Sequence, residues 1–213
     1  MSIDVKICGL SDEAAVDAAC EGGARFTGFV FFPASPRAVT PKRAAELTRR
    51  VPGDVVRVAL VVDADDRLLA EITGAAGIDM LQLHGRETPG RTAEVRERFG
   101  FPVMKVLPVA GPDDVGRARD YEDAADWLMF DAKPPEGASR PGGLARAFDW
   151  GLLKGGAWKR PWLLAGGLTA ENLARAVAES GAGAVDVSSG VEDAPGRKNP
   201  AKIRDFLAAA RSL

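Results

Sequence analysis

One cysteine and one aspartate occupy positions from which a thiol and a carboxyl group could do acid–base chemistry. Cys8 ends a short β-favouring run that begins at Val5, and Gly9 then breaks this run. Asp131 follows the apolar residues 127–130, where an unpaired carboxylate would be costly. An ionised thiol is a base, and a protonated carboxyl group is an acid. We interpret Cys8 as either a packed apolar residue or a catalytic base, and Asp131 as either a loop cap or a functional group.

Lys6 is the residue that could tune Cys8. Side chains two residues apart in a strand point to the same face, so Lys6 shares the face of Cys8. Because a nearby cation favours the thiolate, we expect Lys6 to lower the pKa of Cys8; the alternative is a solvated lysine at the start of the strand. His84, the only histidine, follows a different strand, and no pattern pairs it with Cys8 as in a Cys–His nucleophile.

Short apolar runs alternate with longer amphipathic ones along the chain. The apolar runs lack polar alternation, which is typical of parallel strands buried on both faces. Eight strand–helix units favour an α/β fold, a closed (β/α)₈ barrel, although periodicity alone leaves an open doubly wound sheet as an alternative. Since no linker or break in composition divides the chain, we predict one barrel domain over residues 1–213. The strands are expected at 4–8, 26–32, 55–62, 80–83, 103–107, 127–131, 162–165 and 184–188.

Helices are expected between these strands. Thr40-Pro41 and Asn199-Pro200 each combine a capping side chain with a proline in the first turn. The sixth helix is poorly marked and is placed at 149–154. The other helices are expected at 12–21, from Thr40 onward, and at 66–75, 92–98, 112–120, 169–180 and 201–210.

Polar residues stand at several strand ends that ought to be apolar. In a barrel these carboxyl ends meet around one mouth, where catalytic groups gather. Arg37 lies in the loop after the second strand; its planar fork suits a carboxylate, but a solvated loop arginine fits the sequence equally well. The polar residues at the ends are Cys8, Gln82, His84, Asp131, Asp186 and Ser188.

Two glycine-containing stretches follow the seventh and eighth predicted strands. Glycine lets backbone N–H groups approach an anion closely, and the loops after strands seven and eight are the usual phosphate site of a (β/α)₈ barrel. We therefore predict a phosphate cradle rather than plain turns. Its residues are Gly166, Gly167, Ser188, Ser189 and Gly190.

Composition narrows the classes of function. The formal net charge is −2, with 28 Lys+Arg and 30 Asp+Glu, which argues against broad electrostatic binding of nucleic acid. Two cysteines, Cys8 and Cys20, give no disulfide framework, and with one histidine they give no zinc spacing. No apolar signal core or run of membrane length is present. We expect a soluble cytoplasmic protein with a small-molecule substrate and no nucleic-acid or membrane partner.

Six segments, in order along the chain, together resemble phosphoribosylanthranilate isomerase, an enzyme family of tryptophan biosynthesis. Their combination is far more specific than any single motif. The segments are Val5-Lys6-Ile7-Cys8-Gly9-Leu10, Gly28-Phe29-Val30-Phe31 with Ser35-Pro36-Arg37, Gln82-Leu83-His84-Gly85, Phe148-Asp149-Trp150, Leu164-Ala165-Gly166-Gly167-Leu168 and Val185-Asp186-Val187-Ser188-Ser189-Gly190-Val191-Glu192.

This resemblance implies a barrel that converts N-(5-phosphoribosyl)anthranilate to 1-(2-carboxyphenylamino)-1-deoxyribulose 5-phosphate, an Amadori rearrangement without metal or organic cofactor. It implies that Asp131 protonates the ribose ring oxygen, that the ring opens to a protonated Schiff base, and that the Cys8 thiolate removes the proton from C2′. Arg37 matches the residue that holds the anthranilate carboxylate. The two glycine-containing stretches match the phosphate cradle, and Asp186 and His84 match pocket positions.

The chain departs from the family pattern in one loop. The family usually carries Gly-Gly-Thr-Gly before Phe-Asp-Trp, so this chain lacks a threonine hydroxyl and a glycine there, and Arg140 or Arg146 is a candidate to compensate. Phe32 stands where a tyrosine is common, which we expect to be harmless. The altered loop reads Gly142-Gly143-Leu144-Ala145-Arg146-Ala147.

The sequence alone leaves two other classes of function possible. A sugar-phosphate epimerase barrel would need metal-ligating histidines, and a single histidine argues against it. A barrel that binds a phosphorylated ligand without catalysis is compatible with the altered loop, although such a protein needs neither Cys8 nor Asp131. The sequence leaves monomer and homodimer undecided.

Overall fold

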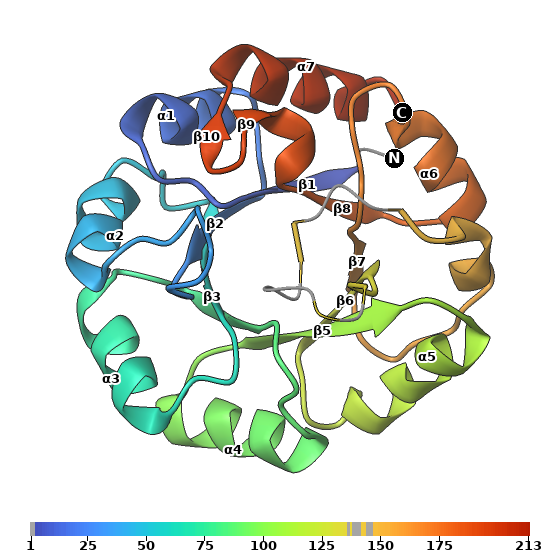
Figure 1. Cartoon of the computed structure of the whole chain (residues 1–213), viewed down its shortest axis with the longest axis horizontal. Helices are drawn as coiled ribbons and strands as arrows, with labels where there is room; N and C mark the ends of the chain where they lie inside the picture. The colour runs from blue at the N-terminus through green and yellow to red at the C-terminus, as the bar shows by residue number, and fades with distance from the viewer. Residues whose placement is uncertain (1–2, 136, 138–141, 144–146) are drawn as a thin grey trace.

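Eight parallel strands close into a barrel in the computed structural model, which describes residues 3–135, 137, 142–143 and 147–213. Figure 1 looks down this barrel, with the strands in an inner ring and the helices around them. Each strand pairs with the next along the chain, and β8 pairs with β1. The strands are β1 (Asp4–Cys8), β2 (Phe26–Val30), β3 (Val56–Val61), β4 (Met80–Leu83), β5 (Val103–Val109), β6 (Trp127–Ala132), β7 (Trp162–Leu164) and β8 (Ala184–Val187). The predicted fold class is confirmed.

Helical segments cover the outside of the barrel. Asp12, Thr40, Asp65 and Thr88 cap helices by accepting a hydrogen bond from a backbone N–H in the first turn. The segments are α1 (Glu13–Glu21), α2 (Pro41–Thr48), α3 (Asp66–Ala75), α4 (Pro89–Phe99), α5 (Pro112–Gly116), η1 (Arg117–Tyr121), η2 (Trp150–Leu153), α6 (Leu173–Ser180), η3 (Ser189–Val191) and α7 (Pro200–Arg211). A short hairpin, β9 (Glu192–Ala194) and β10 (Arg197–Lys198), lies between β8 and α7.

Two apolar layers stabilise the barrel. The larger one lies between the strands and the helices, and the smaller one fills the interior. In the interior, side chains from alternate strand positions replace water, as in other barrels of this kind. The interior residues are Phe26, Val58, Met80, Met104, Val106, Met129, Leu163, Ala165 and Ala184.

Several predicted boundaries were wrong. The helix expected at 112–120 divides into α5 and a 3-10 turn, η1, and the sixth helical region is only the 3-10 turn η2. The helix expected from 169 begins at Leu173, because the Asn172 side chain accepts a hydrogen bond from Thr169 N and donates one to Gly167 O. These two bonds hold the preceding residues in a turn. Among the described residues, no helix is long and apolar enough to cross a membrane.

A buried ion pair fixes the loop after β4. Lys105 Nζ on β5 lies 2.7 Å from Glu87 Oε2 and donates to Gly85 O at 2.8 Å. The same carboxylate accepts from the backbone N–H groups of Asp63 and Gly85 at 2.8 and 2.9 Å. This network joins the loops after β3 and β4, and so holds the loop on which His84 stands.

The Lys105→Met substitution should lower the free energy of unfolding by about 3–5 kcal/mol, because it leaves the Glu87 carboxylate buried without its cation. Urea-induced unfolding of the purified protein would measure the loss. The double variant Lys105→Met/Glu87→Gln should lose less than the single variant. A loss below about 1 kcal/mol for Lys105→Met would show that the pair is not needed for stability.

Candidate active site

Lys6 and Asp186 form a buried ion pair across the strands β1 and β8. They are direct partners in the parallel register, and Lys6 Nζ lies 2.8 Å from Asp186 Oδ1. Lys6 is 0% exposed, which overturns the alternative of a solvated lysine. Burial acts to lower the pKa of Lys6, but Asp186 and Cys8 together outweigh it and the pKa is raised. Lys6 is therefore held as a cation in the barrel interior.

Cys8 lies beside this pair as predicted, but its ionisation differs from the prediction. Burial raises the pKa of the Cys8 thiol, and the lowering effect of Lys6 does not overcome it. The Asp186 carboxylate also acts to raise this pKa, because it opposes a second negative charge nearby. Lys6 does act to lower this pKa, as expected, but the net shift is upward, because the sequence did not show how completely the thiol is buried or that Lys6 is paired with Asp186.

Gly28 on β2 provides the space that Lys6 and Cys8 occupy. A Cβ at Gly28 would lie 2.9 Å from Lys6 Nζ and 3.1 Å from Cys8 Sγ. Both distances are shorter than ordinary carbon contacts, so a larger residue would displace one of the two groups. Gly28 begins one of the six segments that resemble the family, but the sequence predicted no role for it.

Asp131, at the end of β6, faces the same mouth. The side chain is 11% exposed, and Oδ1 accepts a hydrogen bond from Ala132 N at 2.8 Å. Its Oδ2 lies 3.3 Å from His84 Nε2, which makes no hydrogen bond to any of the described residues. Gln82 Nε2 in turn lies 3.1 Å from His84 Nδ1. One oxygen of Asp131 thus binds the backbone of its own loop, as the capping interpretation predicts. The side chain also lines the cleft, so a functional role is compatible with its position.

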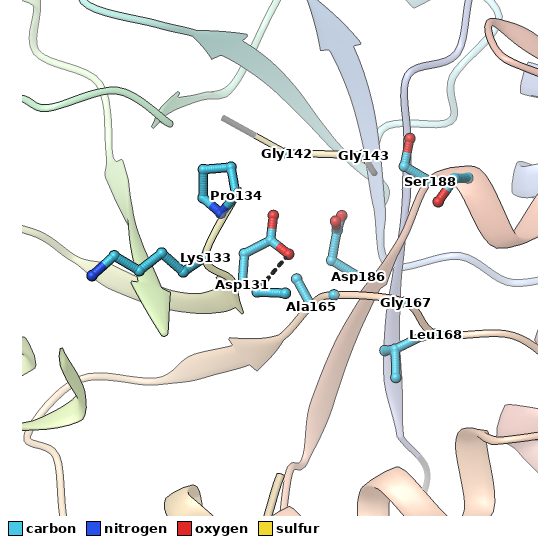
Figure 2. A pocket seen from close by; sticks show the side chains of 13 residues that line it. Asp131, Lys133, Pro134, Gly142, Gly143, Ala165, Gly167, Leu168, Asp186 and Ser188 are labelled. Carbon is cyan, nitrogen blue, oxygen red and sulfur yellow. Dashed lines mark hydrogen bonds between the residues drawn. The ribbon is translucent and has the colours of Figure 1, made fainter. Parts of the chain in front are cut away.

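Two adjoining cavities form the mouth of the barrel. The first holds about 450 Å³ between its atoms and is lined by Gly166, Gly167 and Ser189 among others. The second holds about 470 Å³ and is lined by Cys8, Arg37 and His84, together with apolar side chains. They are two halves of one cleft, because both are lined by Asp131, Gly142, Gly143, Asp186 and Ser188. Figure 2 shows the carboxylates of Asp131 and Asp186 pointing toward the Gly142–Gly143 segment.

The predicted phosphate residues gather at the first cavity with one exception. Gly166 and Gly167 have φ angles of +92° and +66°, which favour glycine. Ser188 and Ser189 line the cavity, whereas Gly190 does not and packs against the Leu168 carbonyl. A Cβ at Gly190 would collide with that carbonyl, so this glycine holds the loops after β7 and β8 together.

Arg37 lies at the second cavity, but it is not a free arginine. It is 4% exposed, and its Nε and Nη2 atoms each lie 2.7 Å from a carboxylate oxygen of Glu192. Lys198 Nζ lies 2.8 Å from the same carboxylate. Sequence reasoning missed Glu192 and Lys198 as site residues. Glu192 is the last residue of the segment 185–192 that resembles the family, but no role was predicted for it. No motif in the sequence pointed to Lys198.

The Gly142–Gly143 segment crosses the mouth over these groups. A Cβ at Gly142 would lie 2.7 Å from His84 Nε2 and 2.9 Å from Asp131 Oδ2. A Cβ at Gly143 would lie 2.6 Å from Arg37 Nη1. Both glycines are therefore needed at this place, while the remainder of the altered loop (144–146) and Arg140 lie outside the described residues. In the described part of the chain, no group of three or more acidic, histidine or cysteine side chains could hold a metal ion.

Comparison with known proteins gives one consistent match. A family model described as N-(5'-phosphoribosyl)anthranilate (PRA) isomerase matches residues 5–209. The isomerase of Paramagnetospirillum magneticum is 56% identical over 211 residues, covering 99% of this chain and 98% of that protein. The isomerase of Rhodospirillum centenum is 54% identical and covers 100% of both chains.

Solved structures agree with the sequence match. The phosphoribosylanthranilate isomerase of Thermotoga maritima superposes with a TM-score of 0.88 at 33% identity, covering 99% of this chain and 100% of that one. A further isomerase structure, at 30% identity and a TM-score of 0.84 with the same coverage, is a complex with reduced 1-(o-carboxyphenylamino)-1-deoxyribulose 5-phosphate. The match sets aside the sugar-phosphate epimerase. The chain belongs to the N-(5'-phosphoribosyl)anthranilate isomerase family.

Proposed function

We propose that the chain converts N-(5-phosphoribosyl)anthranilate to the aminoketose phosphate with Cys8 as general base and Asp131 as general acid. The observation that carries this assignment is that a buried thiol and a carboxyl group line one cleft, in which Asp186 is already paired with Lys6. An acid and a base on different strands can act on different atoms of one bound sugar. The reaction is an isomerisation in tryptophan biosynthesis.

The two halves of the cleft suit the two ends of this substrate. Gly166, Gly167, Ser188 and Ser189 offer backbone and hydroxyl groups to the phosphate in the first cavity. The apolar part of the second cavity suits the aryl ring, with Arg37 at its edge for the carboxylate. The related isomerase that was solved in complex with reduced 1-(o-carboxyphenylamino)-1-deoxyribulose 5-phosphate has a ligand with a phosphate and a carboxyphenyl group, which supports a substrate that carries both groups. Holding both ends leaves the ribose between Cys8 and Asp131.

The proton transfers then balance. Asp131 in its acid form gives a proton to the ribose ring oxygen, the C1′–O bond breaks, and a protonated Schiff base forms at C1′. The Cys8 thiolate takes the proton from C2′, and the electron pair neutralises the Schiff base to give an enolamine. The enolamine tautomerises to the ketone by losing the proton of the C2′ hydroxyl and gaining one at C1′. No step adds or removes an electron pair from the substrate as a whole. The cycle leaves Cys8 protonated and Asp131 ionised, so one proton passes from the thiol back to the carboxylate through solvent before the next turnover.

The raised pKa of Cys8 fits a role that begins only when substrate is bound. In the empty cleft, burial raises the pKa and the thiol holds its proton. The protonated Schiff base is a cation that forms next to the thiol during the reaction, and a nearby cation favours the thiolate.

We also propose that residues 1–213 act as one barrel domain in the cytoplasm, as a monomer or homodimer, without a metal or organic cofactor. The continuous closure of the barrel from β1 to β8 supports the single domain. The presence of only two cysteines, both unpaired, suits a reducing compartment.

The Cys8→Ala and Asp131→Asn variants should each lower kcat by about 10² or more, because each removes a group that moves a proton. Fluorescence of the anthranilate adduct, followed as it is consumed, would measure turnover on purified protein. Cys20→Ala is the matched control, since Cys20 lies on α1 outside the cleft and should leave kcat unchanged. Near-normal turnover in folded Cys8→Ala or Asp131→Asn would reject the assignment for that residue.

The Arg37→Ala variant should raise KM by about 10- to 100-fold with a smaller effect on kcat, because it removes a charge-assisted contact with the bound carboxylate. Steady-state kinetics with the same fluorescence assay would separate the two constants. Arg50→Ala, which removes an exposed ion pair with Asp17, should leave KM unchanged. An unchanged KM in Arg37→Ala would show that Arg37 serves only the fold.

A further inference from the structure

Three buried charged side chains form a network at the edge of the second cavity. They are Arg37 from the loop after β2, Glu192 at the start of β9 and Lys198 in β10. The side chains of Arg37 and Glu192 are each 4% exposed, and that of Lys198 is 0% exposed. Glu192 and Lys198 line neither cavity and exchange no proton with the substrate, although the Lys198 cation acts to lower the pKa of Cys8, so the network needs a further explanation.

Glu192 fixes the direction in which Arg37 points. The carboxylate binds Nε and Nη2 of Arg37, each at 2.7 Å, in the two-pronged geometry that holds a guanidinium in one plane. The third nitrogen, Nη1, is left on the side of Gly143, where a Cβ would lie only 2.6 Å from it. Gly143 and Arg37 both line the second cavity. Nη2 also donates to Gly143 O at 3.4 Å, whereas Nη1 makes no hydrogen bond to any of the described residues and is the donor that can meet a ligand.

Lys198 joins this pair to the other half of the cleft. Its Nζ donates to Glu192 Oε1 at 2.8 Å, to Ser188 O at 2.8 Å and to Ser188 Oγ at 3.2 Å. The hairpin pairs Lys198 directly with Glu192, which sets this geometry in the backbone. One ammonium group thus connects the arginine of the aryl end to a residue that lines both cavities.

The network carries one positive charge in excess. It holds one carboxylate and the side chains of an arginine and a lysine, and all three are buried. Burial lowers the pKa of Lys198 while Glu192 acts to raise it, so the carboxylate next to it favours the cationic form of the lysine. Burial acts to raise the pKa of Glu192, but Arg37 and Lys198 outweigh it and the pKa is lowered, so the carboxylate stays ionised. A buried excess charge is costly in an empty site and favourable when an anion lies next to it. An aryl carboxylate at Arg37 Nη1 would neutralise it.

We propose that Glu192 and Lys198 are positioning residues that hold Arg37 for the carboxylate of the aryl group, and that they select substrates carrying this carboxylate. The inference rests on the proposed function, because it takes the orientation of the substrate from it. Its specific claim is that both residues act through Arg37 and do not serve the barrel in general.

The test compares two substrates in each variant: the phosphoribosyl adduct of anthranilate and that of aniline, which lacks the carboxylate. In Glu192→Asp the shortened side chain keeps its charge but cannot bind both nitrogens of Arg37 as before. In Lys198→Met the excess positive charge is removed. Each variant should lose about 10- to 100-fold in kcat/KM for the anthranilate adduct and only about two- to threefold for the aniline adduct.

The control is Asp79→Glu, which alters the carboxylate of the ion pair between Asp79 and Arg57, a pair that lies before β4 and at the start of β3 and lines neither half of the cleft. Its ratio of kcat/KM values for the two substrates should equal that of the wild type. Circular dichroism and urea unfolding would show that each variant is folded. If Glu192→Asp does not fold, Lys198→Met decides the question by the same ratio.

Equal losses with the two substrates in Glu192→Asp or Lys198→Met would overturn the inference, because a purely structural role affects both alike. A wild type without turnover of the anthranilate adduct would instead reject the proposed function. In that case the inference is judged by the dissociation constants of the two reduced ketose products, with and without the carboxylate. A variant that weakens binding of both products equally overturns it.

Discussion

The ion pair between Lys6 and Asp186 is the interaction on which the site depends. It joins the first and last strands of the barrel where the sheet closes, and the lysine is 0% exposed. Two charges at this depth are tolerated only as a pair, because either one alone would be buried without a counter-ion. The pair also sets the surroundings of Cys8, two residues along β1. Because the Asp186 carboxylate neutralises the charge of Lys6, it limits how far Lys6 can lower the pKa of the thiol.

Buried charges also position the loops of the mouth. Arg37 and Glu192 are 155 residues apart in sequence and meet in one two-pronged contact. The ion pair between Lys105 and Glu87 joins the loop after β3 to the loop after β4, and His84 lies on the loop after β4. The two charges of each pair lose their hydration on burial, so the pair is stable only when they stay in contact. Displacing one partner would leave the other buried without a counter-ion. The loops of a barrel mouth are usually its variable parts, and here these contacts restrain them to the geometry that the two cavities require.

The strands and the gathering of the site could be predicted from the sequence, because both follow from local patterns. Apolar runs without alternation predicted strands, and β4 has the predicted bounds. The positions of Cys8 and Asp131 at strand ends predicted that both line one mouth, as they do. The charge partners could not be predicted. No spacing relates Arg37 to Glu192, since their contact depends on how the β9–β10 hairpin packs against the loop after β2. Lys6 acts to lower the pKa of Cys8 as predicted, but the net rise could not be predicted, because it depends on burial and on the contact between Lys6 and Asp186. The position of Lys6 on the strand was local information, whereas its pairing with Asp186 was not.

Burial holds the Cys8 thiol in its protonated form, and the Lys6–Asp186 pair limits how far the Lys6 cation can oppose this. Ultraviolet absorbance of the thiolate, followed against pH and taken as the difference between wild type and Cys8→Ser, reports this group alone because Cys20 cancels. A raised pKa means that the thiol keeps its proton as the pH rises through neutrality, so the wild-type midpoint should lie above the ordinary value of 9.0. In an Asp186→Asn background the midpoint should move to lower pH, because the Lys6 cation is then left for the thiolate. A wild-type midpoint at or below 9.0, or one that Asp186→Asn does not move, would contradict the account.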